Sequence, residues 1–380
     1  MKANTVHRLV RLCLVVSVVL MLAGADVIAH AQQAACLGLK ADDCQLLANA
    51  RRVTLAALLS YNIDYDVNFK VAGTPDGDIA LTLHGTGPVD TNGADVRGLA
   101  GQGASPSLTK LANVLSKLIL GTTLDLETVM KGKDTKLHIE VRLLNNTLYF
   151  NSPTITKGGW KSIDLKPMID GLNKMASNAL ATDKTQPAAT PPAISAETLK
   201  EFQTLGTIEG LLTAERGPDL TVGKDVLAAF IIHVDLQKVL TWPDLIPLIK
   251  SSQAKSAPDK QMTDDQIKAM LAQVSTAIKD LKISFTRYVG VTDRLPHGGS
   301  FDITGQADLS GLKDLAPNTA SKNSSAAAAL SGPIGLDIHL KVVLSAIGEK
   351  ANLTAPADAQ PFKGGDSSGS EATPNASAAG

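Results

Sequence analysis

The stretch that decides the fold is YNIDYDVNFKV, residues 61–71. Apolar and polar residues alternate in it without a break, and the apolar ones are Tyr61, Ile63, Tyr65, Val67, Phe69 and Val71. This period of two predicts a β-strand with one buried face and one face in solvent. Such a strand is typical of an antiparallel sheet, because strands of parallel sheets are usually covered on both faces.

Further strands are predicted after this stretch. A turn at residues 73–77 leads to a returning strand that contains Ile79, Leu81 and Leu83. The glycine-rich, polar stretch 85–104 is interpreted as a loop. The other predicted strands lie at residues 137–143, 148–150, 160–165, 226–234, 283–291, 301–309 and 334–342.

Helices are predicted before and between these strands. Thr263 and Gln266 have the spacing of a capping box, which begins a helix reaching Leu281. Ser105 and Pro106 fit the N-cap and first position of a helix whose apolar stripe ends at Leu118 and Ile119. Three more helices are predicted at residues 42–57, from residue 167 and from residue 196.

These elements predict an α+β protein in which a large, curved antiparallel β-sheet, shaped as a half-barrel, packs on several α-helices. Residues 182–192 are rich in Pro, Ala and Thr and are interpreted as a flexible connector inside the domain. The parts before and after it have similar layouts, so they form either one large sheet or two related lobes. The single sheet is favoured, because each part offers few strands by itself.

The N-terminus has the pattern of an export signal. A basic start is followed by an apolar run at residues 12–24 and by a small-x-small site that ends at Ala31. The run is shorter than the roughly 20 residues that span a bilayer, so cleavage before Gln32 is favoured over anchoring. We therefore expect residues 1–31 to be a signal peptide and the mature protein to be secreted or located in the cell envelope, outside the cytoplasm.

The mature chain then consists of one α+β domain, residues 32–362, and a tail, residues 363–380. The tail is predicted to be disordered, because it is rich in Gly, Ser, Ala and Thr and has no apolar periodicity. Cys36 and Cys44 are the two cysteines left after cleavage. We expect them to form a disulfide that fixes the new N-terminus and contributes roughly 2.5 kcal/mol. A redox or metal-binding pair is disfavoured, because there is no Cys-x-x-Cys spacing.

The composition argues against several functions. Without residues 1–31 the chain has 33 basic and 36 acidic residues, and aromatic residues make up only 3% of the sequence, so no nucleic-acid partner is expected. The motifs of serine hydrolases, zinc proteases and phosphate-binding loops do not occur. We therefore expect no enzyme, no catalytic residue and no cofactor.

A metal site is not expected either. His84, His138, His233 and His339 lie in or beside predicted strands, and His297 is placed in a turn. Their spacing is not that of a zinc site. Asp64 and Asp66 share the polar face of the first strand and are interpreted as a solvated pair, although two such carboxylates are able to share a proton or a cation.

The apolar strand faces have two interpretations. Such faces are ordinarily packed core, but they line a ligand cavity where a bent sheet is wider than its helices fill. The candidate lining residues are Ile63, Tyr65, Val67, Ile79, Leu81, Leu83, Ile139, Val141, Ile338 and Leu340.

The order of these features resembles a known family. The chain begins with the leader, and a long alternating strand and a helix follow it. The next features are Leu148-Tyr149-Phe150, then Gly159-Trp160 leading to residues 163–165, and finally a closing segment at residues 353–362. This order, over residues 42–362, resembles the envelope carriers of the LppX/LprG lipoprotein type, which have a LolA-like half-barrel. The resemblance implies an apolar cavity that carries acyl chains or lipidated molecules. Lipidation is not expected, because no cysteine directly follows the apolar run of the leader.

Two functions follow from this sequence. The favoured one is a non-catalytic extracytoplasmic carrier that binds lipid or another hydrophobic ligand between sheet and helices, with association to the envelope surface. The alternative is a structural or interaction protein of the cell envelope with a filled core. An exported hydrolase is a third class, which no motif supports.

Overall fold

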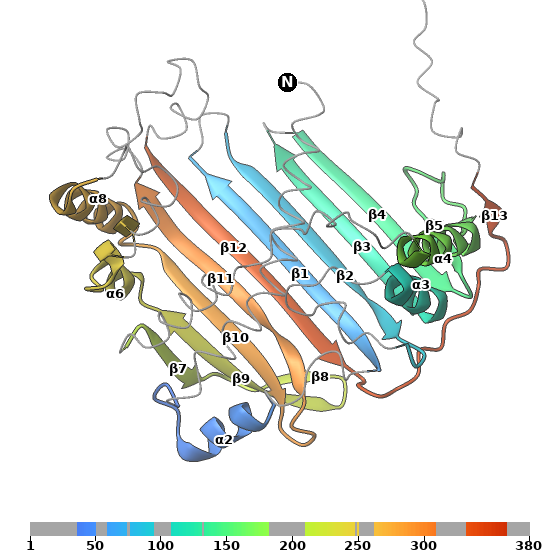
Figure 1. Cartoon of the computed structure of the whole chain (residues 1–380), viewed down its shortest axis with the longest axis horizontal. Helices are drawn as coiled ribbons and strands as arrows, with labels where there is room; N and C mark the ends of the chain where they lie inside the picture. The colour runs from blue at the N-terminus through green and yellow to red at the C-terminus, as the bar shows by residue number, and fades with distance from the viewer. Residues whose placement is uncertain are drawn as a thin grey trace, which may run out of the picture.

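The computed structural model describes residues 36–50, 59–73, 77–94, 108–130, 133–181, 210–247, 249–250, 262–308 and 332–362. They form an α+β structure built on an open 13-stranded sheet (Figure 1). The strands are β1 Ser60–Ala72, β2 Ile79–Asp90, β3 Ile119–Met130, β4 Lys133–Leu144, β5 Thr147–Asn151, β6 Lys161–Asp164, β7 Leu212–Arg216, β8 Leu220–Val222, β9 Asp225–Val234, β10 Lys282–Gly290, β11 Pro296–Asp308, β12 Pro333–Ser345 and β13 Gln360–Pro361. The predicted fold class is confirmed.

One sheet joins the two parts of the chain, as the sequence favoured. The strand order is β13-β6-β5-β4-β3-β2-β1-β12-β11-β10-β9-β7, and β8 also pairs with β9. The joint is the antiparallel pair of β1 with β12, in which Val67 stands opposite Leu340. All strand pairs are antiparallel except β13 with β6.

Helices lie near both ends of this sheet (Figure 1). They are α2 Ala41–Ala50, α3 Leu108–Lys117, α4 Lys166–Ala181, α6 Leu236–Leu240 and α8 Asp264–Ala277. Helices α3 and α4 pack against each other, and α6 contacts α8. Helix α2 packs on β9 and β10, where Leu47 and Ala50 join Ala228, Phe230 and Val289 in a buried cluster. In the described residues, no helix combines the length and apolar character that crossing a membrane requires.

Several local predictions are confirmed. Strand β1 covers the whole alternating stretch, and the Cys36–Cys44 disulfide is present. Thr263 and Gln266 form both hydrogen bonds of the capping box that begins α8. The strands predicted at 137–143 and 148–150 are β4 and β5, and the turn that joins them contains Asn145 and Asn146, both with the positive φ angles typical of a two-residue hairpin turn.

Two predictions were wrong. Strand β2 continues to Asp90, although residues 85–104 were interpreted as a loop. The glycines there serve close packing, because a Cβ at Gly87 would lie 2.0 Å from the Gly121 carbonyl oxygen. Strand β3 was missed, because Ile119 was assigned to the preceding helix and now begins that strand.

Other predictions lie outside the described residues. They are the signal peptide at 1–31 with its cleavage site between Ala31 and Gln32, residues 51–57 of the first helix, the connector 182–192, the helix from residue 196 and the tail 363–380.

Candidate functional site: the apolar face of the sheet

The ten candidate lining residues share one face of the sheet. Val67 of β1 stands opposite Leu83 of β2 and Leu340 of β12. Leu83 in turn stands opposite Leu126 of β3, which faces Leu137 of β4. Residues opposite each other in neighbouring strands project to the same side, so these rows form one continuous apolar face. The same registers place Ile63, Tyr65, Ile79, Leu81, Ile139, Val141 and Ile338 on it.

Most of this face is only partly covered. Val67 and Leu340 are buried, with 8% and 5% of their surfaces exposed. The other eight candidate residues are half-buried. Since burial of apolar surface is favourable by about 25 cal/mol per Å², a broad half-buried apolar face has binding free energy to offer a hydrophobic partner.

The face extends beyond the candidates chosen from the sequence. Leu124 and Leu126 of β3 belong to it, and they were missed together with their strand. On the other side of β12, Phe285 and Phe301 add two rings whose centroids are 4.9 Å apart. Their alternation with polar neighbours is a signal that could have identified them.

Tyr65 lies across the face. A Cβ at Gly85, the residue opposite it in β2, would sit 2.2 Å from the Tyr65 ring. The phenol oxygen is 3.4 Å from the Thr122 hydroxyl of β3, so the ring spans β2. Gly85 is therefore required because the tyrosine ring occupies the place of a side chain. Tyr61, on the same strand face, is sufficiently buried that desolvation raises its pKa.

Two arginines also stand on the apolar face, on either side of Phe230. In β7, Arg216 is opposite Phe230 of β9, and in β10, Arg287 is opposite the same residue. The guanidinium of Arg216 lies 5.1 Å from the Phe230 ring centroid and is paired with Asp43, at 3.5 Å, and with Asp219. Arg287 makes no hydrogen bond or ion pair within the described part of the chain.

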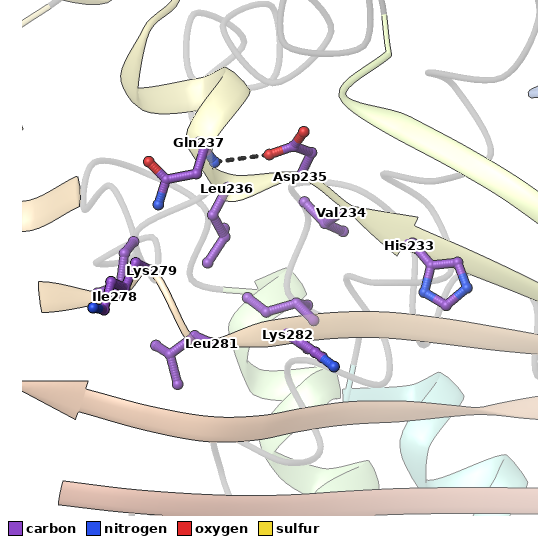
Figure 2. A pocket seen from close by; sticks show the side chains of 10 residues that line it. His233, Val234, Asp235, Leu236, Gln237, Ile278, Lys279, Leu281 and Lys282 are labelled. Carbon is purple, nitrogen blue, oxygen red and sulfur yellow. Dashed lines mark hydrogen bonds between the residues drawn. The ribbon is translucent and has the colours of Figure 1, made fainter. Parts of the chain in front are cut away.

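A separate, small pocket lies where β9 ends and β10 begins. Figure 2 shows side chains of His233, Asp235, Lys279 and Lys282 around it. Its volume is about 200 Å³, below the ~300–1,000 Å³ of typical small-molecule sites. None of the ten candidate residues lines it. Its small size does not suit a lipid chain.

The opposite face of the sheet carries paired charges. Hydrogen bonds of 2.7 Å and 2.6 Å join His84 to Asp66 and His138 to Asp125. His339 is hydrogen-bonded to Asp302, and His233 to Glu215 at 3.2 Å. Register explains the pairs, because His84, His138 and His339 each stand directly opposite their partner in a neighbouring strand.

One group on this face has the composition of a metal site. Asp64, Asp66 and His84 bring their ligand atoms within 4.8 Å of one another. The sequence separates the histidine from the two carboxylates, and the β1–β2 register brings them together. All three residues are half-buried, and His84 already has Asp66 as its partner, so the group is also a satisfied polar surface.

The placement of His297 in a turn was wrong. His297 lies in β11 and is completely buried. Its Nδ1 donates to the Leu344 carbonyl at 2.6 Å, and its Nε2 lies 2.9 Å from Asp293. The ring therefore links the β10–β11 turn to β12, a structural role.

Comparisons with known proteins do not assign a family. No family model matches the sequence, and no curated protein matches it. Among solved structures, the chain is similar to LprF from Mycobacterium bovis, with 10% identity and a TM-score of 0.26 over 82% of this chain and 95% of that chain. A likeness this weak assigns neither family nor function to the chain.

Proposed function

We propose that this protein is a non-catalytic, extracytoplasmic carrier that binds a lipid or another hydrophobic ligand against the apolar face of its sheet. The observation that supports the proposal is the half-buried apolar face, which runs without interruption from β4 through β12 to β10. An open sheet offers such a face to a chain-like ligand, because neighbouring strands present parallel rows of aliphatic side chains.

The first test is extraction of the purified protein with organic solvent, followed by mass spectrometry. We expect about one hydrophobic molecule per chain. The neutral dye Nile red should bind the delipidated protein with increased fluorescence. A clean extract together with no dye uptake would favour the alternative, a structural or interaction protein of the cell envelope with a filled core.

A matched pair of variants in β2 locates the binding face. Leu83 is half-buried on the apolar face, whereas its neighbour Thr82 is exposed on the polar face. Leu83→Gln should weaken Nile red binding several-fold, because it places an amide where the ligand would lie. Thr82→Gln should leave binding unchanged. Equal effects of the two variants would contradict the placement of the ligand on this face.

A further inference from the structure

Arg287 differs from the rest of the apolar face of the sheet. It follows Ile283 and Phe285 on the same side of β10, so its side chain projects among aliphatic and aromatic residues. Phe230 is its neighbour in β9 and Gly299 its neighbour in β11. Gly299 carries no side chain, so no side chain of β11 stands opposite Arg287.

The charge on Arg287 has no counter-ion in the described part of the chain. A guanidinium has five N–H donors and no acceptor. No described residue accepts a hydrogen bond from it or forms an ion pair with it. Burial lowers the pKa of Arg287, and no nearby carboxylate opposes that shift. Arginine nevertheless keeps its proton at neutral pH, so the side chain is a partly desolvated cation.

The neighbouring arginine shows what a structural charge looks like at this place. Arg216 also stands opposite Phe230, on the other side from Arg287, but it lies over that ring and has two carboxylates, those of Asp43 and Asp219. A half-buried cation without such partners is unfavourable for the folded chain alone. An arginine of this kind is suited to bind an anion from outside, because its planar fork matches a carboxylate or a phosphate group.

We infer that Arg287 holds the anionic head of an amphiphile, a carboxylate or phosphate group joined to a hydrocarbon chain that lies on the apolar face. The inference rests on the proposed carrier function and names its ligand class. Beyond Gly299, the row that contains Arg287 continues through Val342 of β12 and Tyr65 of β1 to Gly85 of β2. The four strand spacings from Arg287 of β10 to Gly85 of β2 cover about 19 Å, a length suited to a long alkyl chain.

The test compares ligands that share one chain and differ in their heads. Dodecanoate, dodecyl phosphate and neutral dodecanol are titrated into delipidated protein below their aggregation concentrations, with displacement of Nile red as the signal. Inorganic phosphate is the probe without a chain. Wild-type protein should bind at least one of the two anions about tenfold or more tightly than dodecanol, the usual effect of a charge-assisted hydrogen bond. The stronger of the two anions identifies the head group as carboxylate or phosphate.

Variants then assign the preference to one side chain. Arg287→Met should bind the anions no more tightly than dodecanol and should leave dodecanol binding unchanged. Arg287→Lys keeps the charge without the planar fork, so it should retain part of the preference. Arg216→Met is the matched control and should retain all of it. Circular dichroism verifies the fold of each variant, and Arg287→Lys carries the test if Arg287→Met does not fold.

Three results would overturn the inference. One is equal binding of anions and dodecanol by the wild-type protein, which leaves the carrier function standing because dodecanol still binds. Another is an anion preference that survives in Arg287→Met. The third is tight binding of inorganic phosphate with no gain from the chain, which would mean a free anion. Failure of all three dodecyl ligands would overturn the carrier function and this inference together.

Discussion

The two arginines beside Phe230 occupy the same face of the same sheet and have opposite surroundings. Arg216, in β7, stacks on the ring and is held by Asp43 of α2 and by Asp219. Arg287, in β10, has aliphatic and aromatic neighbours and no partner in the described chain. The difference separates a charge that helps to hold α2 on the sheet from a charge that the fold does not need.

A charge that binds a ligand can be recognised in a structure without a ligand by whether it is paired within the chain. A charge that serves folding is paired within the chain, because an unpaired one is unfavourable when water is excluded. A charge that stays unpaired on an apolar face makes the folded state less stable, and a partner from outside restores the lost stability. Stability measurements therefore distinguish the two roles even before a ligand is known.

The largest expected effect comes from Phe230, which stands between the two arginines in the strand register. Phe230 is completely buried and belongs to the cluster that includes Leu47 and Ala50 of α2. Phe230→Ala should lower the free energy of unfolding by about 3–5 kcal/mol, measured by urea denaturation, because it leaves a cavity. The half-buried Phe285 is the control, and Phe285→Ala should have a smaller effect. A larger loss at Phe285 would mean that the centre of packing lies elsewhere.

Arg216→Met should come second, with a loss of about 1–2 kcal/mol in the free energy of unfolding. It removes a contact with the ring and two ion pairs, and it leaves Asp43, 25% exposed, without its partner. The control Asp219→Asn removes only the more exposed partner, which is 45% exposed, and should cost a few tenths of a kcal/mol. If Arg216→Met left the free energy of unfolding unchanged, the contrast with Arg287 would be lost.

Arg287→Met should have the opposite sign. The variant keeps an unbranched, flexible side chain and removes a half-buried charge without a partner in the described chain, so the ligand-free protein should gain about 1 kcal/mol in unfolding free energy. Thermal denaturation of delipidated protein measures the shift. A loss comparable to that of Arg216→Met would show that Arg287 has a structural partner in the folded chain and would weaken its assignment to a ligand.

The sequence predicted the faces of the strands much better than their neighbours. Alternation at residues 61–71 gave the length of β1 and the side on which Tyr65 projects. Parity in β10 would also have placed Arg287 with Ile283 and Phe285 on the apolar side. Whether Arg287 has a counter-ion could not be predicted from the sequence, because this depends on its neighbours in β9, β11 and α2.

Glycine is a poor indicator of a loop where it serves packing. Residues 85–90 were interpreted as loop because glycine is common in turns. In β2, Gly85 and Gly87 instead allow the Tyr65 ring and the backbone of β3 to approach closely. Cross-strand pairing was hidden for a different reason, because it depends on the register of the strands. Asp66 and His84 are 18 residues apart and meet only through the β1–β2 register.

The polar face of the sheet extends the comparison, because His84, His138 and His339 have carboxylate partners there, as Arg216 has on the apolar face. The hydrogen bond to Asp125 raises the pKa of His138 above the ordinary value of 6.5, with a smaller contribution from the charge of Glu140. A raised pKa in the folded state means that protonation of His138 favours folding. This stabilisation is complete below about pH 6.5 and is lost as the pH rises through the pKa of the folded state.

The smallest expected effect is the pH dependence of this pair. The unfolding free energy of wild-type protein should exceed that of His138→Gln by a few tenths of a kcal/mol at pH 5.5, since the side chain is 43% exposed and solvent screens the pair. The difference should shrink toward pH 8.5, because His138 is then neutral. Asp125→Asn should reduce the same pH dependence, because it removes the carboxylate that raises the pKa. If the difference in unfolding free energy between wild-type protein and His138→Gln grew with pH, the pair would favour the neutral imidazole. The contrast between paired and unpaired charges would then hold only on the apolar face.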